Sequence, residues 1–100
     1  MENYNKLVRD KIPERLDSKG ISYEKRIATT EEYKEELIKK LEEEIKEFLE
    51  LKNSEELADI LEVIEAIKKL PEFSNVEEIK KQKLEERGGF EKKIILKGEK

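Results

Sequence analysis

Three acidic residues interrupt the apolar faces of two predicted helices. With about 100° between successive residues, Glu44 falls inside the apolar arc of the first helix. Glu56 and Asp59 fall inside the apolar arc of the second helix. A carboxylate among apolar side chains is costly unless a cation compensates its charge. The pattern therefore predicts a site for hard divalent ions, which prefer oxygen ligands.

The link between these helices brings carboxylates from both of them together. If the chain reverses near Asn53, residues whose numbers sum to about 106 face each other across an antiparallel pair. Glu47 then faces Asp59, and Glu44 lies one turn along on the same side. A solvated helix face rich in glutamate accounts for the position of any one of these residues. It accounts poorly for three acidic residues that lie within apolar arcs and line up across the two helices.

The composition excludes several other chemistries. The 100 residues include no His and no Cys, which excludes a Ser-His-Asp triad, a cysteine nucleophile, a disulfide and an ordinary zinc site. Lys and Arg number 22 and Asp and Glu 26, so the net charge of −4 argues weakly against a nucleic-acid partner. No apolar run approaches the roughly 18 residues of a membrane span, and polar sequence follows Met1 in place of a signal peptide. We expect a cytoplasmic protein with neither a membrane nor a nucleic-acid partner.

The elements that must position the carboxylates are helical. We expect one all-α domain over residues 1–100, burying roughly 60–68% of its unfolded surface. Pro13 opens a short helix and Gly20 closes it. Three capping boxes mark the starts of longer helices: Thr29 with Glu32, Asn53 with Glu56, and Ser74 with Glu77. The first is expected to run to about Lys52, the second to end before Pro71, and the third to end at Gly88 and Gly89.

Two further segments are loosely apolar and outside these helices. If residues 26–28 and 94–96 are both extended, they pair as a short β-ribbon beside the helices. This ribbon is a minor addition to a helical hairpin or bundle.

The carboxylate motifs resemble those of a known enzyme superfamily. Residues 40–47 (KLEEEIKE) and 56–59 (ELAD) resemble the E-E-x-x-E…E-x-x-D signature of the MazG-like nucleoside triphosphate pyrophosphohydrolases, which are all-α. Residues 5–13 (NKLVRDKIP) and 87–92 (RGGFEK) are similar to the ends of a compact house-cleaning branch. The resemblance covers nearly the whole chain. Residues 48–55 make a shorter link between the halves than the MazG enzymes have, which leaves less room for a loop over a base.

The resemblance implies hydrolysis of a nucleoside triphosphate, expected to be non-canonical, to the monophosphate and pyrophosphate. It implies Mg²⁺ as the cofactor, with Mn²⁺ able to substitute, and Glu44 is the candidate general base. The implied metal ligands are Glu43, Glu44, Glu47, Glu56 and Asp59. The helical faces independently support Glu44, Glu47, Glu56 and Asp59 as ligands. They support Glu43 least.

Two basic groups are candidates for binding the substrate phosphates. Lys6, Arg9 and Lys11 lie in the opening motif, and Lys80, Lys83 and Arg87 share a stripe on the third long helix. Either group alone is compatible with an ordinary solvated surface. The resemblance favours Arg9, Lys83 and Arg87 for substrate contact, with Lys6 and Lys11 beside them.

Two long amphipathic helices expose more apolar surface than one short helix can cover. We therefore expect a homodimer or a higher homo-oligomer. The alternative function is a non-catalytic acidic helical module that binds a protein partner.

Overall fold

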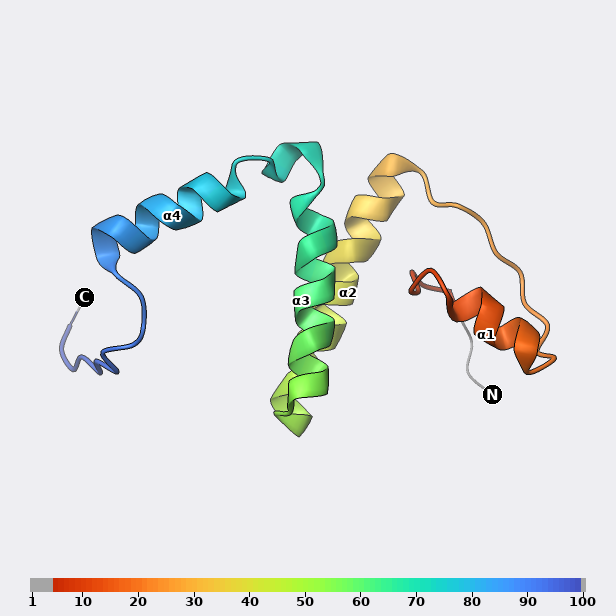
Figure 1. The fold of residues 1–100 in the computed structure, drawn as a ribbon, viewed down its shortest axis with the longest axis horizontal. Helices are drawn as coiled ribbons and strands as arrows, with labels where there is room; N and C mark the ends of the chain where they lie inside the picture. Colours follow the sequence, from red (N-terminus) through yellow and green to blue (C-terminus); the bar gives the residue numbers. More distant parts are fainter. Residues whose placement is uncertain (1–4, 100) are drawn as a thin grey trace.

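The computed structural model describes residues 5–99, and the all-α prediction is confirmed. Figure 1 shows α2 and α3 as a central hairpin, with α1 and α4 on opposite sides of it. Met1, on which the expectation of no signal peptide rests, lies outside the described residues. The elements are α1 (Ile12–Ser18), α2 (Thr30–Leu51), α3 (Ser54–Lys68), the 3-10 turn η1 (Pro71–Phe73) and α4 (Val76–Arg87).

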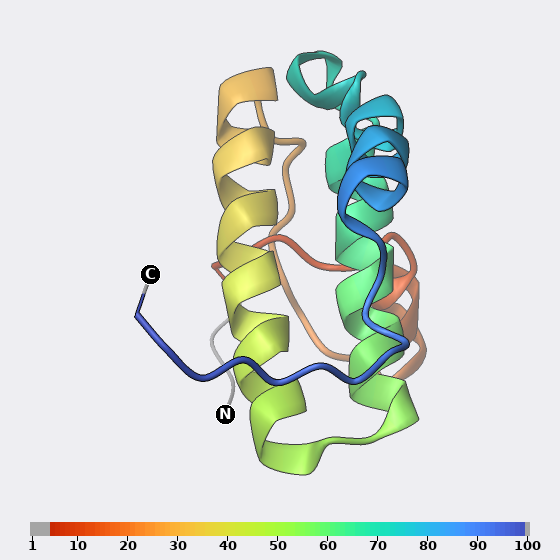
Figure 2. The ribbon, with the colours of Figure 1, turned by 90° about the vertical axis from the view of Figure 1, so that its left-hand side faces the viewer.

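The central hairpin begins and reverses at the predicted capping residues. The Glu32 backbone N–H donates to Thr29 Oγ1 at 3.2 Å, and the Glu56 backbone N–H donates to Asn53 Oδ1 at 2.9 Å. Between the helices Lys52 takes a left-handed φ of 48°, so the chain reverses through Lys52 and Asn53 alone. Figure 2 shows the resulting antiparallel pair side by side.

The predicted start of α4 is wrong. The helix begins at Val76, and its N-cap residue Asn75 makes no side-chain capping bond. Ser74 already has a right-handed helical backbone at the end of η1, whereas a capping serine needs an extended backbone. Glu77, the other half of the predicted box, instead forms an ion pair with Lys68 at the end of α3.

The β-ribbon that the sequence left open does not form within residues 5–99. Residues 26–28 lead into α2, whereas residues 94–96 follow α4 on the other side of the hairpin (Figure 1). The two segments are therefore too far apart to pair within one chain. Ile27 and Ile95 are 94% and 92% exposed.

The buried core is small and lies between α2 and α3. Among residues 5–99, its buried hydrophobic residues are Leu37, Val63 and Leu70. Partly buried side chains surround them, namely Leu7, Tyr33, Leu41, Ala66, Ile67 and Phe73. None of the helices in residues 5–99 is both long enough and apolar enough to cross a membrane.

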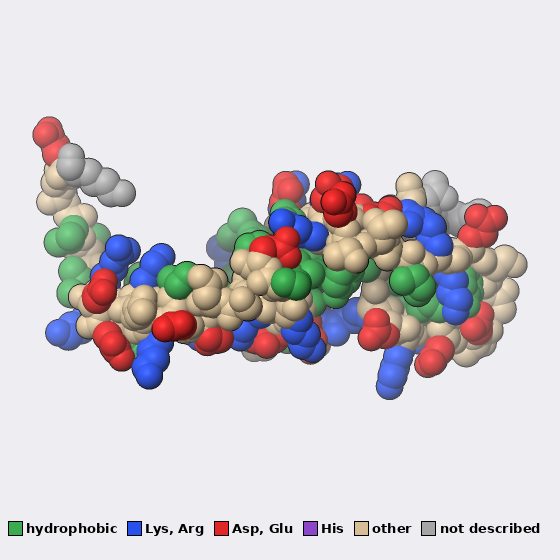
Figure 3. All heavy atoms as spheres, turned by 90° about the horizontal axis from the view of Figure 1, so that it is seen from above, with side chains coloured by type: hydrophobic (Ala, Val, Ile, Leu, Met, Phe, Trp, Pro, Cys, Tyr) green, Lys and Arg blue, Asp and Glu red, His purple; other side chains and the backbone are tan. Residues whose placement is uncertain are grey.

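A single chain is extended and does not reach the expected burial. Its accessible surface is 9767 Å², against about 6,000 Å² for a compact protein of 11.9 kDa, so it buries only roughly 40% of its unfolded surface. The radius of gyration is 18.0 Å, against about 13 Å for a compact chain of this length. The cause is that α1, α4 and the C-terminal segment project from the hairpin, as Figure 3 shows from above.

Candidate metal centre

Four carboxylates converge in the hairpin. Glu44 and Glu47 come from α2, and Glu56 and Asp59 come from α3. Each pair is spaced by three residues, which places both side chains on one face of its helix. The tight turn at Asn53 then brings the two faces together, so that one oxygen from each carboxylate lies within 4.8 Å of the others. Two ligands on opposite sides of one Mg²⁺ are about 4.2 Å apart, so this spacing suits a shared divalent ion.

Two carboxylate oxygens of this group are buried and unpaired. Glu44 is only 7% exposed, and its Oε2 atom has no hydrogen-bond partner among the described residues. The same holds for Glu56 Oε2. A buried acceptor without a partner costs free energy, and a solvated glutamate face would leave neither atom in this state. A cation between the helices would satisfy both atoms.

The electrostatics of Glu44 favour a positive charge close to its carboxylate. Burial raises the pKa of the Glu44 carboxyl, and the negative charge of Glu47 raises it further. Asp59 acts in the same direction, whereas Lys40 partly opposes the increase in pKa. The site therefore favours either a proton on Glu44 or a cation beside it.

The N-terminal segment 5–11 lies across the acidic side of the hairpin. Leu7 packs against the core, and the basic residues on either side of it reach one helix each. Lys6 Nζ donates to Glu43 Oε1 on α2 at 2.8 Å, and Arg9 Nη2 donates to Asp59 Oδ1 on α3 at 2.7 Å. Two of the predicted phosphate-binding residues are thus beside the carboxylates.

Glu43 lies outside the four-carboxylate group, although the resemblance implies that it is a ligand. Its carboxylate bonds to Lys6, and Lys40 Nζ lies 3.5 Å from its Oε2 atom. The hydrogen bond from Lys6 holds the pKa of the Glu43 carboxyl below its usual range. Glu43 is therefore placed to hold the N-terminal segment on the hairpin.

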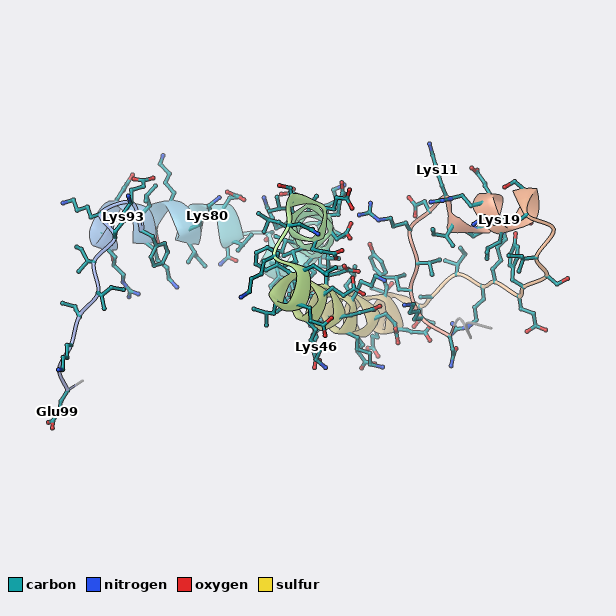
Figure 4. All side chains as sticks on the ribbon, turned by 90° about the horizontal axis from the view of Figure 1, so that it is seen from below. Lys11, Lys19, Lys46, Lys80, Lys93 and Glu99 are labelled. Atoms are coloured by element: carbon teal, nitrogen blue, oxygen red, sulfur yellow. The ribbon has the colours of Figure 1, made fainter. Side chains whose placement is uncertain are left out.

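The remaining predicted phosphate-binding residues are not near the carboxylates of their own chain. Lys11 is exposed and lies beside α1, and its side chain does not point toward the hairpin in Figure 4. Lys83 and Arg87 belong to α4, which projects from the opposite side of the hairpin (Figures 1 and 4).

Lys40 was missed by the sequence-based prediction. Its Nζ atom lies 3.5 Å from Glu44 Oε1, one helical turn away. The spacing of four residues was the available signal, but α2 and α4 contain other Lys–Glu pairs at the same spacing. Only the burial of Glu44 distinguishes Lys40 from the others.

Comparison with known proteins found no match for this chain among family models, curated sequences or solved structures. The resemblance to MazG-like enzymes stays a prediction from the motifs.

Proposed function

We propose that this chain is a Mg²⁺-dependent nucleoside triphosphate pyrophosphohydrolase of the cytoplasm, acting on non-canonical nucleotides. The observation that carries the proposal is the pair of buried, unpartnered oxygens, Glu44 Oε2 and Glu56 Oε2, within a group of four carboxylates. The absence of His and Cys leaves carboxylates, Lys and Arg as the available chemistry, which suits metal ions and phosphates. Mn²⁺, which also prefers oxygen ligands, would substitute.

Glu44, Glu47, Glu56 and Asp59 would hold the ion, which supplies charge neutralisation and an activated water at neutral pH. Arg9 and Lys6 would donate hydrogen bonds to the phosphate oxygens, and Arg is suited to bidentate contact. The water oxygen forms a bond to the α-phosphorus, and the bond from that phosphorus to the bridging oxygen breaks, releasing pyrophosphate. Glu44 is the proposed acceptor of the water's proton, because burial and the negative charge of Glu47 raise its pKa and make its carboxylate more basic than an ordinary glutamate.

The test is incubation with canonical and modified nucleoside triphosphates and Mg²⁺, with pyrophosphate resolved from orthophosphate. We expect the monophosphate and pyrophosphate in equal amounts and no product in EDTA. Glu56→Gln should abolish turnover, whereas Glu62→Gln, an equal charge change at an exposed position of α3, should retain it. Release of orthophosphate as the first product would contradict the proposal.

A non-catalytic interaction module is the second candidate, and the large exposed apolar surface favours it. In that case the acidic hairpin binds a basic protein partner. A catalytic metal site should gain thermal stability from Mg²⁺ through ligand linkage, and an interaction module should not. A folded protein with neither a Mg²⁺-dependent product nor this gain would favour the module.

We also propose that the working unit is a homodimer or a larger homo-oligomer. A chain that exposes roughly 3,800 Å² more than a compact protein of its mass has ample surface for a stable dimer, which buries about 1,000–2,500 Å² per chain. Exposed apolar side chains follow one side of both hairpin helices: Ile38, Ile45 and Leu49 on α2, and Leu57 and Leu61 on α3. A second hairpin covering this side would complete a four-helix core.

A further inference from the structure

Two extended segments of the chain expose apolar side chains and have no partner strand within residues 5–99. Residues 24–27 (EKRI) lead into α2, and residues 94–97 (IILK) follow α4; neither stretch contains a helix, a turn or a left-handed backbone. Their apolar members are all at least 70% exposed: Ile27, Ile94, Ile95 and Leu96. β-branched residues favour strands, and exposed unpaired backbone is a template for pairing with another chain. The two segments are therefore candidate strands without a sheet.

An antiparallel alignment joins these segments with favourable pairs at both ends. When Ile27 lies opposite Ile94, Glu24 lies opposite Lys97. The two positions between them each pair a basic with an apolar side chain, so no like charges meet. Apolar pairs and opposite charges that face each other directly both stabilise neighbouring strands.

Other alignments of the same segments are less favourable. A register shifted so that Ile27 faces Ile95 puts Lys25 opposite Lys97, and the opposite shift places Ile27 against Lys93. Like charges that face each other directly destabilise a strand pair, and the second shift loses the apolar pair. The side-chain pattern thus favours one register.

The charge pattern also selects the direction of pairing. A parallel arrangement with Ile27 opposite Ile94 would put Glu24 opposite Glu91. The two positions between them would then pair basic residues with basic residues. Only the antiparallel direction combines the apolar pair with a pair of opposite charges.

The two segments lie on opposite sides of the hairpin, at overlapping heights along it (Figure 1). They do not pair within one molecule. A two-fold axis parallel to the hairpin would stack a second hairpin on the first and exchange the two sides. Residues 94–97 of each copy would then lie on the same side as residues 24–27 of the other copy, which gives two equivalent contacts in one dimer.

We propose that residues 94–97 of one copy form an antiparallel β-ribbon with residues 24–27 of a second copy, in the register Ile27–Ile94 and Glu24–Lys97. The occupant is a second copy because this chain carries both strands, complementary in charge, and holds them apart in one molecule. A two-stranded ribbon is marginal alone in water, so the ribbons form together with the pairing of the hairpins. The ribbon does not require catalytic activity.

Single thiols test the register. Because the chain has no Cys, Lys25→Cys and Leu96→Cys each introduce one thiol, at positions that face each other in the proposed ribbon. Facing residues are about 5 Å apart between Cα atoms, which suits a disulfide. The two variants, refolded together and mildly oxidised, should give a linked dimer with one chain of each. Lys92→Cys in place of Leu96→Cys is the control, because it lies four positions along the strand, about 13 Å away.

The outcomes of this experiment separate pairing between copies from the alternatives. Both substitutions in one chain should give a dimer joined by disulfides, whereas a monomer closed by an internal disulfide would overturn pairing between copies. No linked mixed dimer, or a control that links as readily, would overturn the proposed register.

Charge reversal gives a reading without cysteine. Glu24→Lys and Lys97→Glu each replace an attractive pair by a repulsive one in both ribbons, so we expect the dimer dissociation constant to rise about tenfold in analytical ultracentrifugation. The double variant restores opposite charges and should return to within about twofold of the wild type. Glu14→Lys, an equal charge change at an exposed position of α1, should have little effect. Additive losses in the double variant would overturn the proposal.

Amide hydrogen exchange separates the ribbon from the pairing of the hairpins. Alternate backbone amides of residues 24–27 and 94–97 should exchange slowly in the dimer, because they donate to the neighbouring strand. The same amides should lose this protection in the monomer that Leu49→Glu gives. A wild-type dimer in which these amides exchange as fast as unpaired chain would overturn the ribbon and leave the hairpin contact intact.

Discussion

Arg9 and Asp59 are 50 positions apart in the sequence, and the Arg9 guanidinium donates to the Asp59 carboxylate at 2.7 Å. Asp59 also belongs to the four-carboxylate group, so Arg9 lies where it would compete with a metal ion for one ligand. A divalent ion that engages Asp59 would free Arg9 to bind a substrate phosphate. Arg9 is exposed and Asp59 is partly exposed, so breaking this ion pair costs little.

Replacing Arg9 should have opposite effects on metal binding and on catalysis. Arg9→Ala removes a competitor for Asp59 and should tighten Mg²⁺ binding up to about fivefold, since an exposed pair contributes at most about 1 kcal/mol. The same variant should lower kcat/KM by about a hundredfold through loss of a phosphate contact. Calorimetry with Mg²⁺ and steady-state kinetics measure the two effects. Arg15→Ala on α1 is the matched control, and equal losses in both measurements would contradict this role.

Removing one charge from the carboxylate group should stabilise the metal-free protein. Glu56→Gln relieves repulsion from three neighbouring carboxylates, and we expect the free energy of unfolding to rise by about 1 kcal/mol in EDTA. In Mg²⁺ the ranking should reverse, because the variant loses a ligand. Denaturant unfolding with and without Mg²⁺ tests this reversal, with Glu62→Gln as the control. A variant that keeps the full Mg²⁺ stabilisation and full turnover would show that the site is elsewhere.

The metal-free protein should lose stability as the pH rises above the ordinary range of glutamate. The folded chain holds the Glu44 proton more tightly than the unfolded chain, because burial and Glu47 raise its pKa. The Glu44 proton contributes its full stabilisation at pH values below the pKa of Glu44 in the unfolded chain. This stabilisation is lost as the pH rises through the raised pKa of Glu44 in the folded chain. Carboxyls with lowered pKa values, such as Glu43 and Glu32, contribute stability that does not change with pH above the ordinary glutamate range. Their contribution is lost only as the pH falls below that range.

Thermal unfolding in EDTA from about pH 5 to 8 measures this slope. Glu44→Gln should flatten it, because glutamine does not titrate. A wild-type melting temperature that increases across this range would contradict the role given to Glu44.

The apolar side of the hairpin should hold the oligomer together. Leu49 and Leu61 are 61% and 54% exposed, so a charge at either position is tolerated in one chain but not against a second hairpin. We expect light scattering at micromolar concentration to give a dimer or larger for the wild type and a monomer for Leu49→Glu. A wild-type monomer would contradict the proposed assembly.

The hairpin was predictable because local signals determine it. Thr29 and Asn53 cap their helices through their own side chains, and the two-residue turn sets which carboxylates face each other. The convergence of Glu47 and Asp59 thus follows from helix periodicity and one turn. Ser74 shows the limit of such signals, since its capping sequence is overridden by the 3-10 turn that Pro71 begins.

The surroundings of the site depend on long-range packing, which the sequence pattern does not encode. Leu7 places Lys6 and Arg9 on different helices, and no local pattern specifies these partners. The sequence pattern also did not predict the position of α4 relative to the hairpin. Its basic stripe was identified, but the ion pair between Lys68 and Glu77, which helps to set its direction, joins two different elements.

The most direct measurement is product analysis after turnover in ¹⁸O-labelled water with Mg²⁺. If the four carboxylates support water attack at the α-phosphorus, the label will appear in the nucleoside monophosphate and pyrophosphate will be unlabelled. Glu56→Gln should give neither product. Label in orthophosphate, or no Mg²⁺-dependent product from the folded wild type, would contradict the proposed function.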